Sequence, residues 1–143
     1  MQQILLGAGG GIAVSEVTAT NATNIVLATV FGSDWAATVD KIYNVPSGVT
    51  IGATAGNAAI LVSSGMGGTL VINVAGAVQG HHGTAGSAGS GSTAAQYYAN
   101  SGGNGGNGGN AISVASTGVT INNTGSISGG GGGGGGGGQG GYR

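Results

Sequence analysis

Residues 71–80 read VINVAGAVQG, and residues 120–129 read TINNTGSISG. The two stretches align without a gap and share the pattern Ile-Asn-x-x-Gly-x-aliphatic-x-Gly. A repeated supersecondary unit is typical of chains that stack copies of one element. Each copy runs directly into glycine, since residues 80–91 are glycine-rich and residues 129–138 are ten consecutive glycines. The repeat therefore predicts a β corner followed by a glycine segment, present twice.

Two shorter sequence similarities extend this unit upstream of its second copy. Residues 117–121, TGVTI, resemble residues 47–51, SGVTI, and residues 110–112, NAI, resemble residues 57–60, NAAI. Within such a unit, aliphatic residues alternate into a narrow core, and Asn side chains can cap the backbone groups of the corners.

The apolar residues between positions 25 and 69 occur in short β-branched runs that are bounded by Gly, Asn, Ser, Asp or Pro. None of these runs has a helical period over a helical length, so the pattern predicts strands and no helix. Pro46, in the sequence VPSG, is typical of a turn that leads into the next strand. The predicted strands cover residues 25–27, 29–31, 37–39, 41–45, 49–51 and 60–62.

Residues 101–110 read SGGNGGNGGN, with an Asn at every third position. A polyproline-II-type helix has three residues per turn, so it would place Asn104, Asn107 and Asn110 on one ridge and bare glycine on the other faces. In that conformation the glycines at 129–138 would span roughly 31 Å, at about 3.1 Å per residue. Such a helix makes no internal hydrogen bonds. Each buried N–H and C=O therefore needs a partner on a neighbouring segment, at a distance that only glycine permits.

The alternative interpretation of these stretches is a disordered glycine linker. A linker needs no triplet phase and rarely returns to a strand, whereas these stretches are attached to β corners. The pattern therefore favours ordered polyglycine-II packing of three segments, at about residues 80–91, 101–110 and 129–141. The residues expected to build the lattice of glycine helices are Asn104, Asn107, Asn110, Gly129, Gly133 and Gly138.

The composition limits the possible functions. The 143 residues include 37 glycines, no cysteine and only five charged side chains, with a formal net charge of −1. With so few Lys and Arg residues, the chain lacks the positive charge that nucleic-acid binding needs, so DNA and RNA are not expected as partners. No apolar run approaches the roughly 18 residues of a membrane span, so membrane insertion is not expected, and the N-terminus lacks the basic region of a secretory signal. Without cysteine, disulfides and zinc–thiolate sites are excluded.

The predicted core is thin, because its apolar residues are mostly Ala, Val and Ile. Ordering the backbone of each residue costs about 1–2 kcal/mol in conformational entropy, and this cost is highest for glycine. We therefore predict an all-β fold in which short strands form a β-sandwich or a β-solenoid-like unit, followed by packed polyglycine-II helices and stabilised by oligomerisation. The expected divisions are an attachment or assembly segment at 1–24, a β-strand domain at 25–79, and a glycine-rich region at 80–143 with a β-hairpin inserted at 111–128.

Catalysis is not expected. Hydrolysis by paired carboxylates needs two placed acids, and the chain contains only Glu16, Asp34 and Asp40. Trp35 beside Asp34 would suit a carbohydrate cleft, but a core anchor or a subunit contact is the better interpretation of this side chain. The glycines at 9–11 form no phosphate loop, because no Gly-Lys-Ser/Thr follows them. We expect no cofactor, no catalytic residue and no metal site.

Residues 3–9, 31–52 and 119–130 resemble the glycine-rich tail proteins of bacteriophages, in which similar β corners precede glycine runs. In tail-fibre tips and host-specificity proteins of this kind, glycine helices pack side by side and their distal loops touch the bacterial surface. The resemblance implies a non-enzymatic adhesin of the virion, outside the cell, that binds an outer-membrane protein or a polysaccharide of the host. It also implies contacts with other virion tail proteins and a homo-oligomer. A trimer suits fibre symmetry, and a single adhesin on a trimeric fibre is the alternative.

Exposed loops between glycine helices would then carry recognition, because Tyr offers amphipathic contact area and Asn, Gln and Ser offer adaptable hydrogen bonds. For Tyr97 and Tyr98 the alternative is a ring packed over a glycine face. For His81 and His82 the alternative is a solvated turn, and no metal is expected because no third His or Cys accompanies them. The candidate receptor-contacting residues are His81, His82, Gln96, Tyr97, Tyr98, Asn100, Gln139 and Tyr142, with Arg143 beside the last.

Two other functions fit the same composition. The first is a purely structural subunit of a virion or an extracellular fibre, whose glycine helices join protomers. The second is an ice-binding protein, since polyglycine-II bundles can present flat faces to ice. Such a face needs rows of Thr or Ala, however, and the triplets here carry Asn.

Overall fold

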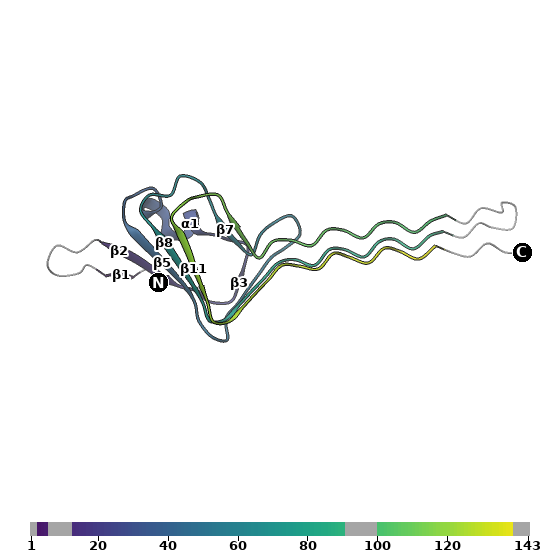
Figure 1. The fold of residues 1–143 in the computed structure, drawn as a ribbon, viewed down its shortest axis with the longest axis horizontal. Coiled ribbons are helices and arrows are strands. Elements are labelled where there is room, and N and C mark those ends of the chain that lie inside the picture. The colour runs from purple at the N-terminus through teal and green to yellow at the C-terminus, as the bar shows by residue number, and fades with distance from the viewer. Residues whose placement is uncertain (1–2, 6–12, 91–99, 139–143) are drawn as a thin grey trace, which may run out of the picture.

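The computed structural model describes residues 3–5, 13–90 and 100–138. They form a body of short strands, from which three extended glycine-rich segments project to one side (Figure 1).

The described strands lie in three sheets. The first sheet has the order β1-β2-β5-β8-β11, and within it β1 is antiparallel to β2 while the other pairs are parallel. The second sheet, β12-β9-β6-β3, and the third, β10-β7-β4, are parallel throughout. The strands are β1 Gln3–Leu5, β2 Val14–Thr18, β3 Ala22–Thr23, β4 Ile25–Val26, β5 Asp40–Val45, β6 Thr50–Gly52, β7 Ile60–Val62, β8 Leu70–Val74, β9 Ala77–Gln79, β10 Ile112–Val114, β11 Val119–Asn123 and β12 Ser126–Ser128.

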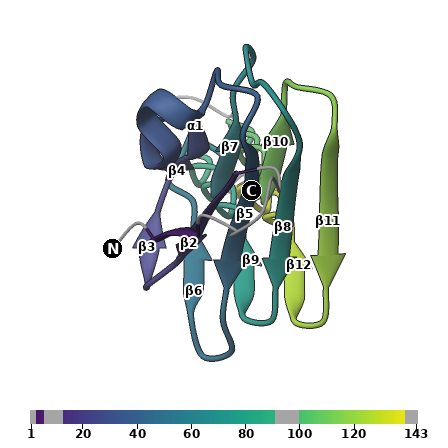
Figure 2. The ribbon, with the colours of Figure 1, turned by 90° about the vertical axis from the view of Figure 1, so that its left-hand side faces the viewer.

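The chain visits the three sheets in turn, so each passage makes one coil of a solenoid. For example, β5 in the first sheet leads to β6 in the second and β7 in the third, and the chain then returns to the first sheet as β8. Figure 2 shows the strands of successive coils side by side. The arrangement is the solenoid-like unit predicted from the sequence. The β-sandwich alternative is wrong, because a sandwich has two antiparallel sheets, whereas here three sheets are present and strands of successive coils pair in parallel.

Alternate residues of the strands fill the interior of the solenoid. Burial alternates along β5, where Lys41, Tyr43 and Val45 point inward, and β8 shows the same alternation. This is the pattern of a strand with one face on a core. The buried hydrophobic residues are Ala19, Leu27, Phe31, Trp35, Tyr43, Val45, Ile51, Ala59, Ile60, Val62, Leu70, Ile72, Val74, Val78 and Ala111.

A short helix, α1 at Leu27–Phe31, and a 3-10 turn, η1 at Gly32–Asp34, lie between β4 and β5. The prediction of strands and no helix was wrong here, since residues 29–31 are helical and residues 37–39 form no strand. Leu27 and Phe31 are one helical turn apart and both are buried, and the Phe31 ring stacks on Trp35 with centroids 6.4 Å apart. Helices this short are stabilised by tertiary packing, which here outweighs the local β preference.

Trp35 is a core residue, as one of the sequence interpretations proposed. Its side chain is buried, and Nε1 donates a hydrogen bond to the carbonyl oxygen of Ser64 at 3.1 Å. The indole therefore fastens the loop before β8 to the segment after α1.

The two copies of the Ile-Asn-x-x-Gly pattern stack directly on each other. Ile72 pairs with Ile121, and Val78 pairs with Ile127, in adjacent parallel strands. The glycine of the pattern lies at the corner between the first and second sheets, where the coils approach closely. A Cβ at Gly125 would overlap the carbonyl oxygen of Gly76, so this corner requires glycine.

Of the two shorter sequence similarities, one corresponds to structurally equivalent positions and the other does not. Ile112 pairs with Ile60, so residues 110–112 and 57–60 do occupy equivalent places in adjacent coils. Residues 47–51 and 117–121 do not, because Ile51 lies in the second sheet and Ile121 in the first.

The β-hairpin expected at 111–128 is also wrong. β10, β11 and β12 each pair in parallel with the equivalent strand of the preceding coil, because this stretch is a further coil of the solenoid. The solenoid also begins before residue 25, since β2 pairs in parallel with β5.

The three glycine-rich segments, residues 80–90, 100–110 and 129–138, lie side by side and are together called the glycine shaft (Figure 1). The first and third run in the same direction, with hydrogen bonds at every third residue: the N–H groups of Gly83, Gly86 and Gly89 donate to the carbonyl oxygens of Gly131, Gly134 and Gly137 at 2.8–2.9 Å. The second runs in the opposite direction and bonds to both others with the same period. The described glycine segments are therefore packed against each other, and the linker interpretation is wrong for them.

Candidate functional site

The cross-section of the glycine shaft is a closed triangle of segments. The N–H of Gly133 in the third segment donates to Gly106 in the second at 2.8 Å, and the N–H of Gly106 donates to Thr84 in the first at 2.7 Å. The first segment donates to the third, as through Gly83 to Gly131 at 2.8 Å. Each segment thus donates to one neighbour and accepts from the other, which satisfies one N–H in every three residues.

Glycine is required where a segment faces the centre of this triangle. A Cβ at Gly83 would overlap the carbonyl oxygen of Gly106, one at Gly105 would overlap that of Gly133, and one at Gly133 would overlap that of Thr84. The same overlap recurs three residues further along each segment. The triplet phase of the sequence is therefore the steric period of the shaft.

The three segments differ in the side chains that they turn outward. The second carries the exposed Asn104, Asn107 and Asn110, which form the ridge predicted from the triplets. The first carries short side chains such as the exposed Thr84 and Ser87. The third carries only glycine. Of its residues predicted to build the lattice, Gly133 is sterically required. A Cβ at Gly129 or Gly138 would instead make ordinary contacts at 3.7 and 3.8 Å.

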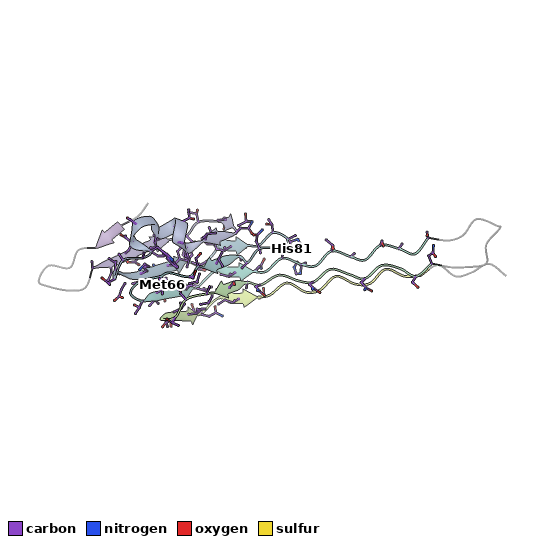
Figure 3. All side chains as sticks on the ribbon, turned by 90° about the horizontal axis from the view of Figure 1, so that it is seen from above. Met66 and His81 are labelled. Carbon is purple, nitrogen blue, oxygen red and sulfur yellow. The ribbon has the colours of Figure 1, made fainter. Side chains whose placement is uncertain are left out.

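The predicted receptor-contacting residues that can be placed lie at opposite ends of the shaft. His81 lies where the shaft leaves the solenoid (Figure 3), and its carbonyl oxygen accepts from the N–H of Gly109 at 2.6 Å. His82 is exposed next to it, and Nδ1 accepts from the N–H of Gly131 at 3.4 Å. Both histidines are thus at the base, and the structure does not bring them together with Asn100.

Asn100 lies at the far end of the shaft, next to Ser90. Its Nδ2 donates to the Ser90 hydroxyl oxygen at 3.1 Å, and its backbone N–H lies 3.4 Å from the Ser90 carbonyl oxygen. The remaining candidates, Gln96, Tyr97, Tyr98, Gln139, Tyr142 and Arg143, lie outside the described residues.

The charged residues that the structure describes all lie in the solenoid. Lys41 is buried, and its Nζ donates to the carbonyl oxygens of Val39, Gly67 and Ala37 at 2.6, 2.7 and 3.3 Å. Burial lowers the pKa of Lys41, and the charges of Asp34 and Asp40 offset part of this. This residue was not among the predicted site residues, although the alternation of DKIYNV places it on the inward face with Tyr43. The ammonium group therefore holds the loop before β5 and the loop before β8 together.

Asp40 has a structural role as well. Its Oδ1 accepts hydrogen bonds from the hydroxyl of Thr69 at 2.8 Å and from the Thr69 N–H at 3.0 Å. These two bonds lower the pKa of Asp40. The carboxylate therefore stays ionised and joins the starts of β5 and β8. A catalytic general acid has a raised pKa, whereas the pKa of Asp40 is lowered.

An asparagine ladder runs across the first sheet. The Nδ2 of Asn122 donates to Oδ1 of Asn73 at 2.9 Å, that of Asn73 to Asn44 at 2.8 Å, and that of Asn44 to the carboxylate of Glu16 at 2.6 Å. These residues bond across coils rather than capping corners. Corner caps do occur elsewhere, as where Oδ1 of Asn24 accepts from the N–H of Thr54 at 2.9 Å.

The described parts of the chain contain no group of three His, Cys, Asp or Glu residues that could hold a metal ion. None of their helices has the length and hydropathy of a membrane span. The described structure is a solenoid from which the glycine shaft projects, and the described residues of the shaft include no Asp, Glu, Lys or Arg.

A protein-family model described as phage tail fibre adhesin Gp38 matches residues 7–143. The chain belongs to this adhesin family. It is therefore a non-enzymatic virion component of the phage tail fibre that binds the host at the fibre tip. No curated protein and no solved structure matches the chain. The phage-tail resemblance noted from the β corners and glycine runs is thus confirmed at the level of the family.

Proposed function

We propose that this adhesin recognises its host with the far end of the glycine shaft, through residues 91–99, which connect its first two segments, and residues 139–143, which follow the third. The observation that carries the proposal is the common end of the three segments, far from the solenoid (Figures 1 and 3). Ser90 and Asn100 are hydrogen-bonded there, and a Cβ at Gly138 would lie 3.8 Å from the carbonyl oxygen of Asn100. The chain between Ser90 and Asn100 contains the adjacent Tyr97 and Tyr98.

The shaft itself is, in this proposal, a bundle of three polyglycine-II helices. Hydrogen bonds at every third residue support this geometry, because such a helix has three residues per turn. Its described surface carries only short polar side chains, alanines and glycine, with one exposed His at the base. The shaft therefore serves to hold the recognition loops away from the fibre.

We propose an outer-membrane protein or a surface polysaccharide as the receptor. Tyr side chains supply rigid amphipathic area for either, and Gln96, Asn100 and Gln139 supply adaptable hydrogen bonds. The solenoid lies at the opposite end of the shaft from Asn100 and would face other tail proteins, with residues 1–24 in the attachment. His81 and His82 lie at the base of the shaft, and so they are the weakest of the candidates for receptor contact.

The test is a double substitution, Tyr97→Ala with Tyr98→Ala, in phage that carries the variant adhesin. We expect adsorption to host cells to fall by about tenfold or more, as for the loss of aromatic anchors from an interface. The circular dichroism and melting temperature of the isolated protein should stay unchanged. The matched control is Asn104→Ala with Asn107→Ala, which removes two exposed polar side chains from the middle of the shaft and should leave adsorption intact.

A phage that adsorbs normally with both tyrosines replaced, while its adhesin remains folded, would contradict the proposed recognition end. The purely structural alternative makes the opposite prediction. It expects the tyrosine variant to adsorb normally and the loss of lattice glycines to abolish assembly.

A further inference from the structure

Two asparagines on the ridge of the glycine shaft are each followed by glycine. Asn104 precedes Gly105 and Asn107 precedes Gly108, and these are the two Asn-Gly pairs of the chain. Asparagine before glycine is the dipeptide most prone to lose its side-chain amide, because glycine has no Cβ to shield its backbone nitrogen and leaves the backbone free to turn. In a folded protein the reaction also requires that the peptide group between the two residues is not held by hydrogen bonds.

The hydrogen bonds of the shaft leave that peptide group free. On either side of the first pair, the carbonyl oxygen of Gly103 and the N–H of Gly106 are bonded to neighbouring segments at 2.8 and 2.7 Å. Between them, no described residue donates to the carbonyl oxygen of Asn104 or accepts from the N–H of Gly105. The pair at Asn107 repeats this arrangement, because the bonds follow the three-residue period of the segment. The peptide group that must turn for the reaction is therefore the unbonded one in each triplet.

The side chains of the two pairs are also accessible. Asn104 and Asn107 are exposed, and within the described residues their side-chain amides make no hydrogen bond. The third asparagine of the ridge, Asn110, is exposed as well but is held differently. Its carbonyl oxygen accepts from the N–H of Ala59 at 3.3 Å, and the residue that follows it, Ala111, is buried. Asn110 is therefore an internal control for the reactivity of the other two.

The packing of the shaft requires glycine after each of these asparagines. A Cβ at Gly105 would overlap the carbonyl oxygen of Gly133, and a Cβ at Gly108 would overlap that of Gly130. A larger residue, which would shield the backbone nitrogen, therefore cannot follow Asn104 or Asn107 without displacing the third segment. The reactive pairs are a consequence of the same close approach that holds the shaft together.

We infer that Asn104 and Asn107 are sites of spontaneous deamidation in the folded adhesin, and that this modification breaks the register between the two ends of the shaft. The backbone nitrogen of Gly105 gives its proton to solvent, and its electron pair attacks Cγ of Asn104. The bond from Cγ to Nδ2 then breaks, ammonia leaves, and a succinimide ring remains. Water opens the ring at either carbonyl carbon, which yields aspartate when the new bond to Cγ breaks and isoaspartate when the original peptide bond breaks. In sum, one water is consumed and one ammonia is released at each site.

Isoaspartate changes the backbone itself. It routes the chain through the former side chain and so adds one carbon atom to the backbone between residue 104 and residue 105. The N–H of Gly103 bonds to Ser87 and that of Gly106 bonds to Thr84, both at 2.7 Å, so the two bonds now share one three-residue phase. With an added atom between them, no single register satisfies both. Aspartate, the other product, places a negative charge in a sequence that has no Asp, Glu, Lys or Arg from residue 42 to residue 142.

The test compares the full chain with the double variant Asn104→Gln and Asn107→Gln, which keeps amides on the ridge but closes the corresponding ring far more slowly. Both proteins are stored in neutral buffer, each acid is located by mass spectrometry with backbone fragmentation, and isoaspartate is measured with isoaspartyl methyltransferase. We expect acids at positions 104 and 107 of the unsubstituted chain while Asn110 is unchanged. The Gly103 amide should lose protection from hydrogen exchange in proportion to the isoaspartate formed, whereas the Gly109 amide, next to the base, and both amides of the variant should keep it.

Asn104 and Asn107 that persist as long as Asn110 would overturn the inference. Isoaspartate that forms while the Gly103 amide stays protected would overturn its effect on the register. The consequence for host binding rests on the recognition end proposed above, and it is measured separately as the adsorption of stored phage. Lost adsorption together with lost protection supports both proposals, whereas normal adsorption despite lost protection would contradict the recognition end and leave the modification sites standing.

Discussion

Replacing Gly133 with Ala tests whether the glycine shaft is a packed structure. The added Cβ would overlap the carbonyl oxygen of Thr84 and would lie 2.5 Å from its carbonyl carbon, so one of the two segments must move. Both contacting groups are backbone atoms, which cannot rotate away as a side chain would. The movement breaks the hydrogen bond from Gly133 to Gly106 and the adjacent bond from Gly86 to Gly134, both 2.8 Å long.

The expected loss follows from these contacts. Two backbone hydrogen bonds contribute about 1 kcal/mol each, and forced displacement of close-packed groups costs about 1–3 kcal/mol more. Replacing glycine by alanine also stabilises the folded state by about 0.4–1 kcal/mol, because it restricts the unfolded chain, and this offsets part of the loss. We therefore expect Gly133→Ala to lower the local stability of the shaft by about 3 kcal/mol.

The assay is native-state hydrogen exchange at the amides of Gly103, Gly106 and Gly136, which reports the free energy of opening of the shaft. The matched control is Gly134→Ala, one residue along the chain, where a Cβ would meet nothing within 4 Å. Both variants are compared at concentrations where the mass shows a monomer, so that only packing within the chain contributes. If the opening free energy in Gly133→Ala equals that of Gly134→Ala, the packing described for the shaft is refuted.

Two further predictions concern the solenoid. Lys41→Met removes the ammonium group and leaves the carbonyl oxygens of Ala37, Val39 and Gly67 without this donor, so the free energy of unfolding in urea should fall by about 2–4 kcal/mol; an unchanged value would show that water replaces the ammonium at no cost. Burial raises the pKa of Tyr43 to about 12, whereas an unfolded tyrosine ionises near pH 10. Between these values the folded state binds the extra proton, so stability should decrease as the pH rises above about 10. Melting temperatures at pH 9 and pH 11 should show a smaller decrease in Tyr43→Phe than in the unsubstituted protein, and equal decreases would contradict the assignment to this residue.

The sequence predicted those features that repeat along the chain at short range. The alternation of DKIYNV and the matching patterns at 71–80 and 120–129 indicated strands that stack in register, as the pairing of Ile72 with Ile121 shows. The Asn triplets indicated a three-residue period, which the hydrogen bonds of the shaft follow. The helix at Leu27–Phe31 was missed, because its two buried residues are as compatible with a strand locally, and only packing on neighbouring strands favours the helix.

The sequence by itself determined the strand pattern, the glycine phase and the absence of charge from residue 42 to residue 142, since each is a property of neighbouring residues. Only the tertiary structure decided that Gly133 is sterically required while Gly134 is open, that Lys41 lies buried among carbonyl groups, and that Asn122 ends a ladder of side chains. Each of these depends on which backbone atoms of distant coils and segments come together. That is set by the register of the solenoid and the triangle of the shaft, because ten glycines in a row are chemically identical until their neighbours distinguish them.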